Sequence, residues 1–141
     1  MPEIKDDPDS IPNPTRLFRR IHPDMIVMDQ NSGQRRPTSA NFSDSSDGTP
    51  MSVYAENIAL ANGEKPEDYL QGRWASFFLA AVIAGNMREH GQEVYPDPEN
   101  QDADEVFQSH AAVKGKKDNK TRKKLGEKSE WVIPPPKDQQ K

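Results

Sequence analysis

The chain has 141 residues, a net charge of −4 and no cysteine, with 32% hydrophobic and 30% charged residues. This length predicts one domain, and the lack of cysteine excludes disulfides, thiolate metal sites and cysteine nucleophiles. The longest apolar run, residues 75–85, is shorter than the roughly 20 residues of a membrane span, and no signal-type leader opens the chain. We therefore expect a soluble, cytoplasmic protein with no membrane contact.

In chain order, the first predicted segment is a disordered tail over residues 1–15, which hold four prolines and four acids. Residues 16–21 and 25–28 predict two short extended pieces around His22-Pro23, because a proline bends the chain and disfavours a central strand. Asn31-Ser32-Gly33 predicts a turn, residues 38–42 a further short strand, and residues 43–50 a loop.

The middle of the chain predicts the core. Residues 51–62 favour a helix whose first residues could instead continue a strand, and residues 66–70 favour a single helical turn. Residues 74–83 are the most hydrophobic stretch, and we expect Trp74, Phe77 and Phe78 in the core. We favour a strand over residues 77–83 and a short helix over 84–90; one continuous helix over 74–90 is the alternative.

The last third predicts an extended piece over residues 94–98, a strand over 106–113, a basic helix over 119–128 and a closing strand over 130–133. Prolines 134–136 then open a second predicted disordered tail, residues 134–141. Together the segments predict an α+β fold: a small single domain over residues 16–133, built from short strands and two or three helices.

Several motifs follow one another in an order that resembles a known pattern. They are LFRRIHP, IVMDQNSG, RRPTSANFSD, MSVY, AGNMREHGQEVYPDP, SHAAVKGKK and EWVIPP. In this order they resemble a family of small, functionally uncharacterised bacterial proteins, over most of residues 17–135. The resemblance implies a bacterial origin and a single domain of similar length, and it assigns no activity and no catalytic residue.

An anion site is the sharpest site hypothesis. If the extended pieces on either side of the 31–33 turn pair as a loose hairpin, their arginines converge with hydroxyl donors, an arrangement that suits phosphate or carboxylate. A histidine in a later strand would add a general acid or base. The alternative is that Arg19 and Arg20 point to opposite faces of a strand and serve the scaffold. The candidate residues are Arg19, Arg20, His22, Arg35, Arg36, Ser39 and His110.

A basic surface is the second hypothesis. Residues 114–128 hold eight bases and two acids, a charge of +6, so the remainder of the chain carries −10. A helix here would gather lysines along one face and engage an acidic protein or a nucleic acid, or simply be solvated. The absence of interleaved aromatics and a pI near 5.4 are unlike a dedicated nucleic-acid binder. The candidate residues are Lys116, Lys117, Lys120, Arg122, Lys123, Lys124 and Lys128.

Common catalytic motifs are missing from the sequence. The three histidines, His22, His90 and His110, form no helical i, i+4 pair, and phosphate-binding glycine loops and a Gly-x-Ser-x-Gly elbow are absent. We therefore expect no metal and no cofactor. The favoured function is a bacterial cytoplasmic binding or accessory protein with an anionic partner. A small enzyme acting on a nucleotide or phosphorylated ligand is the alternative, and the sequence does not decide between them or predict the oligomeric state.

Overall fold

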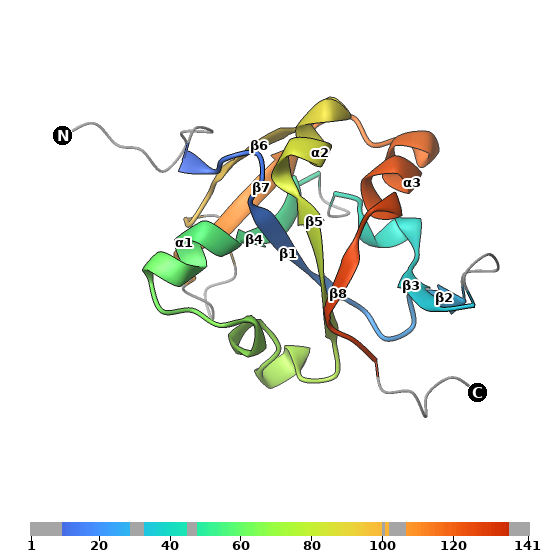
Figure 1. Cartoon of the computed structure of the whole chain (residues 1–141), viewed down its shortest axis with the longest axis horizontal. Coiled ribbons are helices and arrows are strands. Elements are labelled where there is room, and N and C mark those ends of the chain that lie inside the picture. The colour runs from blue at the N-terminus through green and yellow to red at the C-terminus, as the bar shows by residue number, and fades with distance from the viewer. Residues whose placement is uncertain (1–9, 29–32, 45–47, 100, 102–106, 136–141) are drawn as a thin grey trace.

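The computed structural model describes residues 10–28, 33–44, 48–99, 101 and 107–135. In this part of the chain, strands and short helices form one small α+β domain, as predicted (Figure 1). The strands are β1 (Arg16–Ile21), β2 (Ile26–Met28), β3 (Arg35–Pro37), β4 (Met51–Ala55), β5 (Phe78–Ile83), β6 (Glu93–Pro96), β7 (His110–Lys114) and β8 (Glu130–Ile133). The helices are α1 (Glu56–Ala61), α2 (Ala84–Glu89) and α3 (Asn119–Glu127), with 3₁₀ turns η2 (Ser39–Asn41), η3 (Pro66–Tyr69) and η4 (Gly72–Trp74).

A six-stranded antiparallel sheet forms the centre of the domain. Its strand order is β6-β7-β4-β1-β5-β8, so that β1, the first strand in sequence, lies in the interior of the sheet between β4 and β5. Strands β2 and β3 pair only with each other and form a separate hairpin, which lies beside α3 and β8 (Figure 1).

The helices cover one face of the sheet. Side chains alternate between the two faces of a strand, and Leu17, Val53 and Val82 point to the face that packs against the helices. They are fully buried together with Phe42 and with Leu125 of α3. Each apolar side chain buried in this way stabilises the fold by about 1.5–3 kcal/mol.

The opposite face of the sheet carries a smaller, aromatic core. Phe18, Tyr54 and Leu79 point to this face and pack against Tyr69 of η3 and against Phe107. The Tyr54 and Tyr69 rings stack with their centres 4.2 Å apart. The two 3₁₀ turns η3 and η4 therefore serve as the cover of this face in place of a helix.

The three aromatic residues that we expected in the core lie less deep than the sequence predicted, and Phe78, the first residue of β5, is half-buried. Trp74 and Phe77 are half-buried, and their rings meet edge to face with centres 4.9 Å apart. Trp74 ends η4 and Phe77 precedes β5, so both lie outside the strand that enters the sheet. They border the aromatic core instead of forming its centre.

The hydrophobic stretch 74–83 contains the favoured strand, and a short helix follows it. Strand β5 pairs with β1 along its full length, from Arg16 opposite Ile83 to Ile21 opposite Phe78. Helix α2 begins directly after it, at Ala84. The continuous helix over residues 74–90 is therefore wrong, because these residues supply a central pairing of the sheet.

Residues 38–42 do not form the short strand that we predicted. Ser39–Asn41 is the 3₁₀ turn η2. Asn41 closes the turn, since its side-chain Nδ2 donates to the carbonyl oxygens of Thr38 at 3.1 Å and Met25 at 2.9 Å. These bonds replace the backbone pairing that a strand would need.

The domain reaches further toward the N-terminus than residue 16. Ile11 is fully buried in the helix-covered core, and the Thr15 carbonyl accepts a hydrogen bond from the Ala84 amide at 2.9 Å. Residues 10–15 therefore pack with the domain, although we assigned them to the N-terminal tail. Of the predicted C-terminal tail, Pro134 is exposed and Pro135 is buried, while residues 1–9 and 136–141 lie outside the described residues.

Gly126 allows α3 to approach Phe42 closely. A Cβ atom at this position would lie 2.6 Å from a ring carbon of Phe42, which is fully buried and has no space to move. We expect Gly126→Ala to lower the free energy of unfolding by about 1 kcal/mol, because overpacking of about 1–3 kcal/mol outweighs the helix-propensity gain of about 1 kcal/mol.

Urea unfolding of Gly126→Ala checks this expectation. The control is Lys123→Ala on the exposed side of α3, where an alanine meets no neighbouring side chain in the core. A stabilised Gly126→Ala variant would show that Phe42 yields to the added methyl group.

Candidate functional site

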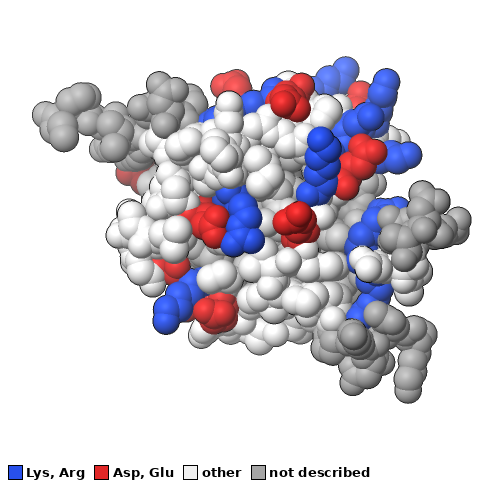
Figure 2. Space-filling view, in the orientation of Figure 1, with Lys and Arg blue, Asp and Glu red and all other residues white. Residues whose placement is uncertain are grey.

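The basic segment of the sequence forms α3, which lies beside the β2–β3 hairpin. Turn η2 follows β3 closely and packs against α3, and Trp131 of β8 donates from Nε1 to the Arg35 carbonyl at 2.9 Å. Figure 2 shows Lys and Arg side chains along the side of the molecule that carries α3 and the hairpin. Two basic regions that are far apart in sequence thus meet at one end of the fold.

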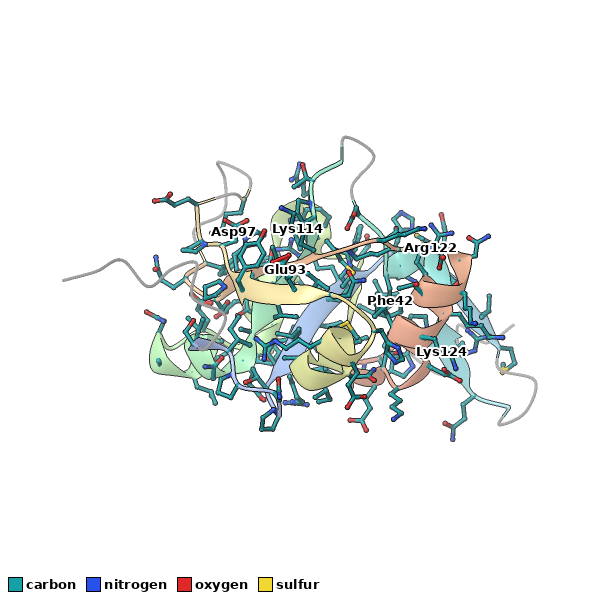
Figure 3. The ribbon with its side chains drawn as sticks, turned by 90° about the horizontal axis from the view of Figure 1, so that it is seen from above. Phe42, Glu93, Asp97, Lys114, Arg122 and Lys124 are labelled. Atoms are coloured by element: carbon teal, nitrogen blue, oxygen red, sulfur yellow. The ribbon has the colours of Figure 1, made fainter. Side chains whose placement is uncertain are left out.

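We name this region the basic end and define it by the exposed lysines of α3 and its C-cap, with the two arginines of β3. Lys120, Lys124 and Lys128 lie four residues apart, Lys123 follows Lys120 by three, and residues at these spacings are neighbours on a helix surface. Figure 3 shows Lys124 on α3, far from Lys114, Glu93 and Asp97 over β6 and β7. The basic end consists of Arg35, Arg36, Lys120, Lys123, Lys124 and Lys128.

Three cations of the predicted basic surface lie outside this stripe. Lys117 is buried, with its side chain 3% exposed, and Nζ lies 2.6 Å from Asp44 Oδ1 and 2.8 Å from the Val113 carbonyl. Arg122 is half-buried and donates to Asn119 Oδ1. Lys116 is exposed but precedes the helix. Lys117 is therefore a structural residue that joins the loop after β7 to the loop before β4.

The first turn of α3 is capped by its own chain. The Asp118 carboxylate accepts a hydrogen bond from the Thr121 amide at 2.9 Å, and this bond holds the pKa of Asp118 below its ordinary value. An aspartate at this position satisfies one of the open amides of the helix N-terminus. The exposed cations of α3, and not its N-terminus, are consequently the groups that can meet an anion.

Arg19 is held inside the fold. Its guanidinium donates to the carbonyl oxygens of Asn41 at 2.9 Å, Ser52 at 2.8 Å and Ser43 at 3.5 Å. Burial lowers the pKa of Arg19 to about 10, so the group stays charged at neutral pH. Arg19 therefore connects β1 with β4 and with the end of η2.

Arg20 points to the other face of the sheet, as the alternation of a strand requires. Its Nε donates to the Tyr69 carbonyl at 2.6 Å, and its guanidinium carbon lies 4.2 Å from the centre of the Trp74 ring and 5.0 Å from that of Tyr54. A cation over an aromatic ring is attracted to the ring face. Arg20 thus fastens η3 and η4 to the sheet.

The two candidate histidines lie apart from each other. His110 is buried in β7, where Nδ1 lies 2.5 Å from the Asp97 carbonyl oxygen and the ring contacts Tyr54. His22 follows β1, accepts a hydrogen bond on Nδ1 from the Asp24 amide at 3.0 Å and meets the Phe77 ring edge to face. Each ring is positioned by contacts within the fold.

The seven candidate anion-site residues do not form one cluster. Strands β2 and β3, on either side of the predicted 31–33 turn, do pair as a hairpin, but β1, which carries Arg19 and Arg20, pairs with β4 and β5 instead. Arg19 and Arg20 lie on opposite faces of the sheet, and Ser39 belongs to η2, whose packing partner is α3. Of the set, Arg35 and Arg36 join the basic end.

A polar network that the sequence did not predict lies under the aromatic core. The Glu64 carboxylate accepts hydrogen bonds from the Tyr69 hydroxyl at 3.0 Å, from Ser109 Oγ at 2.5 Å and from the Gln108 amide at 2.7 Å. Tyr69 and Ser109 are fully buried and lie 2.7 Å apart. The network joins the loop after α1 to the start of β7. Glu64 and Ser109 lie 45 positions apart in the sequence, so no local pattern predicts their contact.

Because of this network, the free energy of unfolding is expected to fall at alkaline pH. Burial and the nearby Glu64 carboxylate raise the pKa of the Tyr69 hydroxyl above its ordinary value, which is about 10. The folded state keeps this proton where the unfolded state loses it, so the contribution of Tyr69 is complete below about pH 10 and falls as the pH rises further.

Urea unfolding of the wild type and of Tyr69→Phe over a pH series measures this effect. We expect the difference in unfolding free energy between the two proteins to shrink above about pH 10. Other titrating groups, Arg19 among them, are common to both proteins and cancel in the difference. A difference that is constant with pH would contradict the raised pKa.

The described residues hold neither a cluster of metal ligands nor a membrane-spanning helix. There, no group of three or more His, Asp or Glu side chains is placed to hold a metal ion. Within the same residues, no helix is long and apolar enough to cross a membrane.

Comparison with protein-family models, with curated proteins and with solved structures finds no match to the chain. The basic end is therefore interpreted from its own geometry and charge.

Proposed function

We propose that the chain is a binding or accessory protein of the bacterial cytoplasm and that it engages an anionic partner through the basic end. The observation that carries the proposal is that α3, with its lysines, lies beside the hairpin strand that carries Arg35 and Arg36, in a chain whose net charge is −4. The bacterial origin rests on the motif resemblance, and the cytoplasmic location rests on composition.

The distribution of charge supports binding. Residues 114–128 carry +6 and the rest of the chain −10. Complementary charge raises association rates and selects partners of opposite sign. Among the exposed lysines, Lys124 has an acidic neighbour on the same helix, Glu127, at 3.9 Å and at the surface, a weak contact that a partner's anion can replace.

Residues considered for the enzymatic alternative have roles within the fold. Arg20 holds η3 and η4, and His22 and His110 are fixed by backbone hydrogen bonds on separate elements. Arg36 lies on the hairpin, away from all three. These contacts favour binding over catalysis as the function to propose.

An affinity pull-down from bacterial lysate, with and without nuclease, tests the proposal. We expect the wild type to capture a specific partner and the double variant Lys120→Glu, Lys124→Glu to bind it about tenfold more weakly. Capture should also weaken steeply as salt rises, because the contacting charges are exposed.

The matched control is Lys65→Glu, which is compared with the single variant Lys124→Glu. Lys65 is exposed beside η3, outside the basic end, so the two single variants change net charge equally. Equal loss of binding in both would attribute capture to overall charge and would overturn the proposed surface.

A further inference from the structure

The β2–β3 hairpin has an outer edge of defined hydrogen-bonding character. The Thr38 amide donates to the Met25 carbonyl at 3.0 Å, and the register places Val27 opposite Arg36 and Met28 opposite Arg35. In an antiparallel pair, residues that exchange hydrogen bonds alternate with residues whose backbone groups point away. Val27 therefore bonds to β3, whereas the N–H and C=O groups of Ile26 and Met28 point outward from β2.

The same rule explains the other edge of the hairpin. Arg35 and Pro37 of β3 point their backbone groups away from β2, and the Arg35 carbonyl accepts the Trp131 Nε1 hydrogen bond. Pro37 has no N–H to offer in any case. That edge is thus attached to β8, while no hydrogen bond joins the outward groups of Ile26 and Met28 to another of the described residues.

The side chains of the hairpin combine apolar and basic character on both faces. Residues directly opposite each other share a face, so Val27 lies beside Arg36 and Met28 beside Arg35. Val27 is 39% and Met28 46% exposed, two of the three large apolar residues exposed in the described part of the chain. Methionine and arginine are enriched in protein interfaces, from which lysine is depleted.

We propose that the outer edge of β2 binds an extended, acidic segment of a partner protein as an added strand. The inference rests on the proposed function, since it names the partner of the basic end. The segment's backbone would bond to Ile26 and Met28, its apolar side chains would cover Val27 and Met28, and its acids would meet Arg35, Arg36 and the α3 lysines. Adding a strand to a sheet edge is an established mode of peptide recognition.

A peptide accounts for the hairpin better than a nucleic acid does. Phosphates would neutralise the arginines but would leave Val27 and Met28 in contact with water, with no gain from their apolar surface. Single-stranded bases stack chiefly on aromatic rings, and the ring of this region, Trp131, is half-buried with its Nε1 engaged. The apolar residues and the bonding edge thus select an acidic peptide.

Amide exchange with a defined probe tests this proposal on the full chain. The probe is a short, end-capped peptide in which pairs of glutamates alternate with pairs of valines, so that each face of its strand carries both kinds of side chain; polyglutamate of equal charge and a short DNA duplex are the comparisons. On adding the alternating peptide, we expect exchange of the Ile26 and Met28 amides, followed by NMR, to slow at least about tenfold. The Val27 amide, already bonded to β3, should change little.

Two variants at one position separate the edge from the side chain. Met28→Pro removes the outward N–H and leaves the bonds to β3 intact, because proline is tolerated where a strand N–H faces away from its neighbour. Met28→Ala removes the side chain and keeps the N–H. We expect Met28→Pro to bind the peptide about tenfold more weakly than Met28→Ala, because the loss of one backbone hydrogen bond weakens affinity by about that factor.

The outcomes distinguish the two proposals. Equal binding by Met28→Pro and Met28→Ala, or polyglutamate binding as tightly as the alternating peptide, would overturn the added strand and leave the basic end standing. Tighter binding of the DNA duplex than of either peptide would assign the basic end to nucleic acid. Failure of the wild type to bind any of the three probes would overturn both proposals.

Discussion

Replacing Tyr69 with alanine is expected to lower the free energy of unfolding by about 4 kcal/mol, the loss typical of a large buried aromatic residue. Tyr69 is fully buried, stacks on Tyr54 and meets Phe107 edge to face with ring centres 4.8 Å apart. Its removal opens a cavity between the sheet and η3. Thermal unfolding should show a decrease in Tm of roughly 15 °C for a domain of this size.

Two milder substitutions divide the contribution of Tyr69 into its parts. Tyr69→Phe keeps the ring and removes the hydroxyl that contacts Glu64 and Ser109, so we expect a loss of about 1–2 kcal/mol. Glu64→Gln keeps the shape of that side chain and one acceptor oxygen, and should cost a similar amount. A Tyr69→Ala variant no less stable than Tyr69→Phe would show that η3 is not a supporting part of the fold.

Arg19→Met is expected to lower the free energy of unfolding by about 3 kcal/mol, because three carbonyl oxygens lose a charged donor. The acceptors belong to Asn41, Ser43 and Ser52, so the change removes the side-chain hydrogen bonds that join β1 to the end of η2 and to β4. Methionine retains an unbranched apolar side chain, which limits the loss of packing. Urea unfolding measures the stability, and the lysate capture measures binding.

Arg19→Lys is the charge-conserving control. Lysine keeps the positive charge but cannot direct donors to three separate carbonyls as the planar guanidinium does, so we expect an intermediate loss of stability. Partner binding by the folded fraction should be unchanged in both variants. A large loss of binding at full stability would return Arg19 to the anion-site hypothesis.

Local pattern was enough to predict most of the strands and helices. Residues 16–21, 78–83 and 130–133 form strands because their apolar and β-branched side chains suit a buried sheet, and α3 begins where Asp118 can cap it. The strand over residues 77–83 was favoured against a continuous helix, and the structure supports that choice. The turn η2 was missed because its cause, the reach of Asn41 to Met25, is a contact across the fold.

The arrangement of the candidate site could not be predicted in the same way. Lys117 resembles its neighbours in sequence, and its burial depends on Asp44, which lies 73 residues earlier. The separation of Arg19 from Arg20 confirms the alternative that the sequence offered, since adjacent residues of a strand point to opposite faces; that both faces of β1 are covered is a property of the sheet order. The meeting of α3 with the hairpin likewise depends on that order, since β3 and α3 are distant in the chain.

The interior position of β1 also has a consequence for how the domain folds. Leu17 pairs with both Ala55 and Val82, so β1 has neither of its neighbours in the sheet until β4 and then β5 have been synthesised. Contacts between residues so far apart in sequence slow folding, because a long loop must close before they form. We expect a refolding rate in the range of predominantly β domains, with β1 protected from hydrogen exchange only late in refolding and retained longest in the native state.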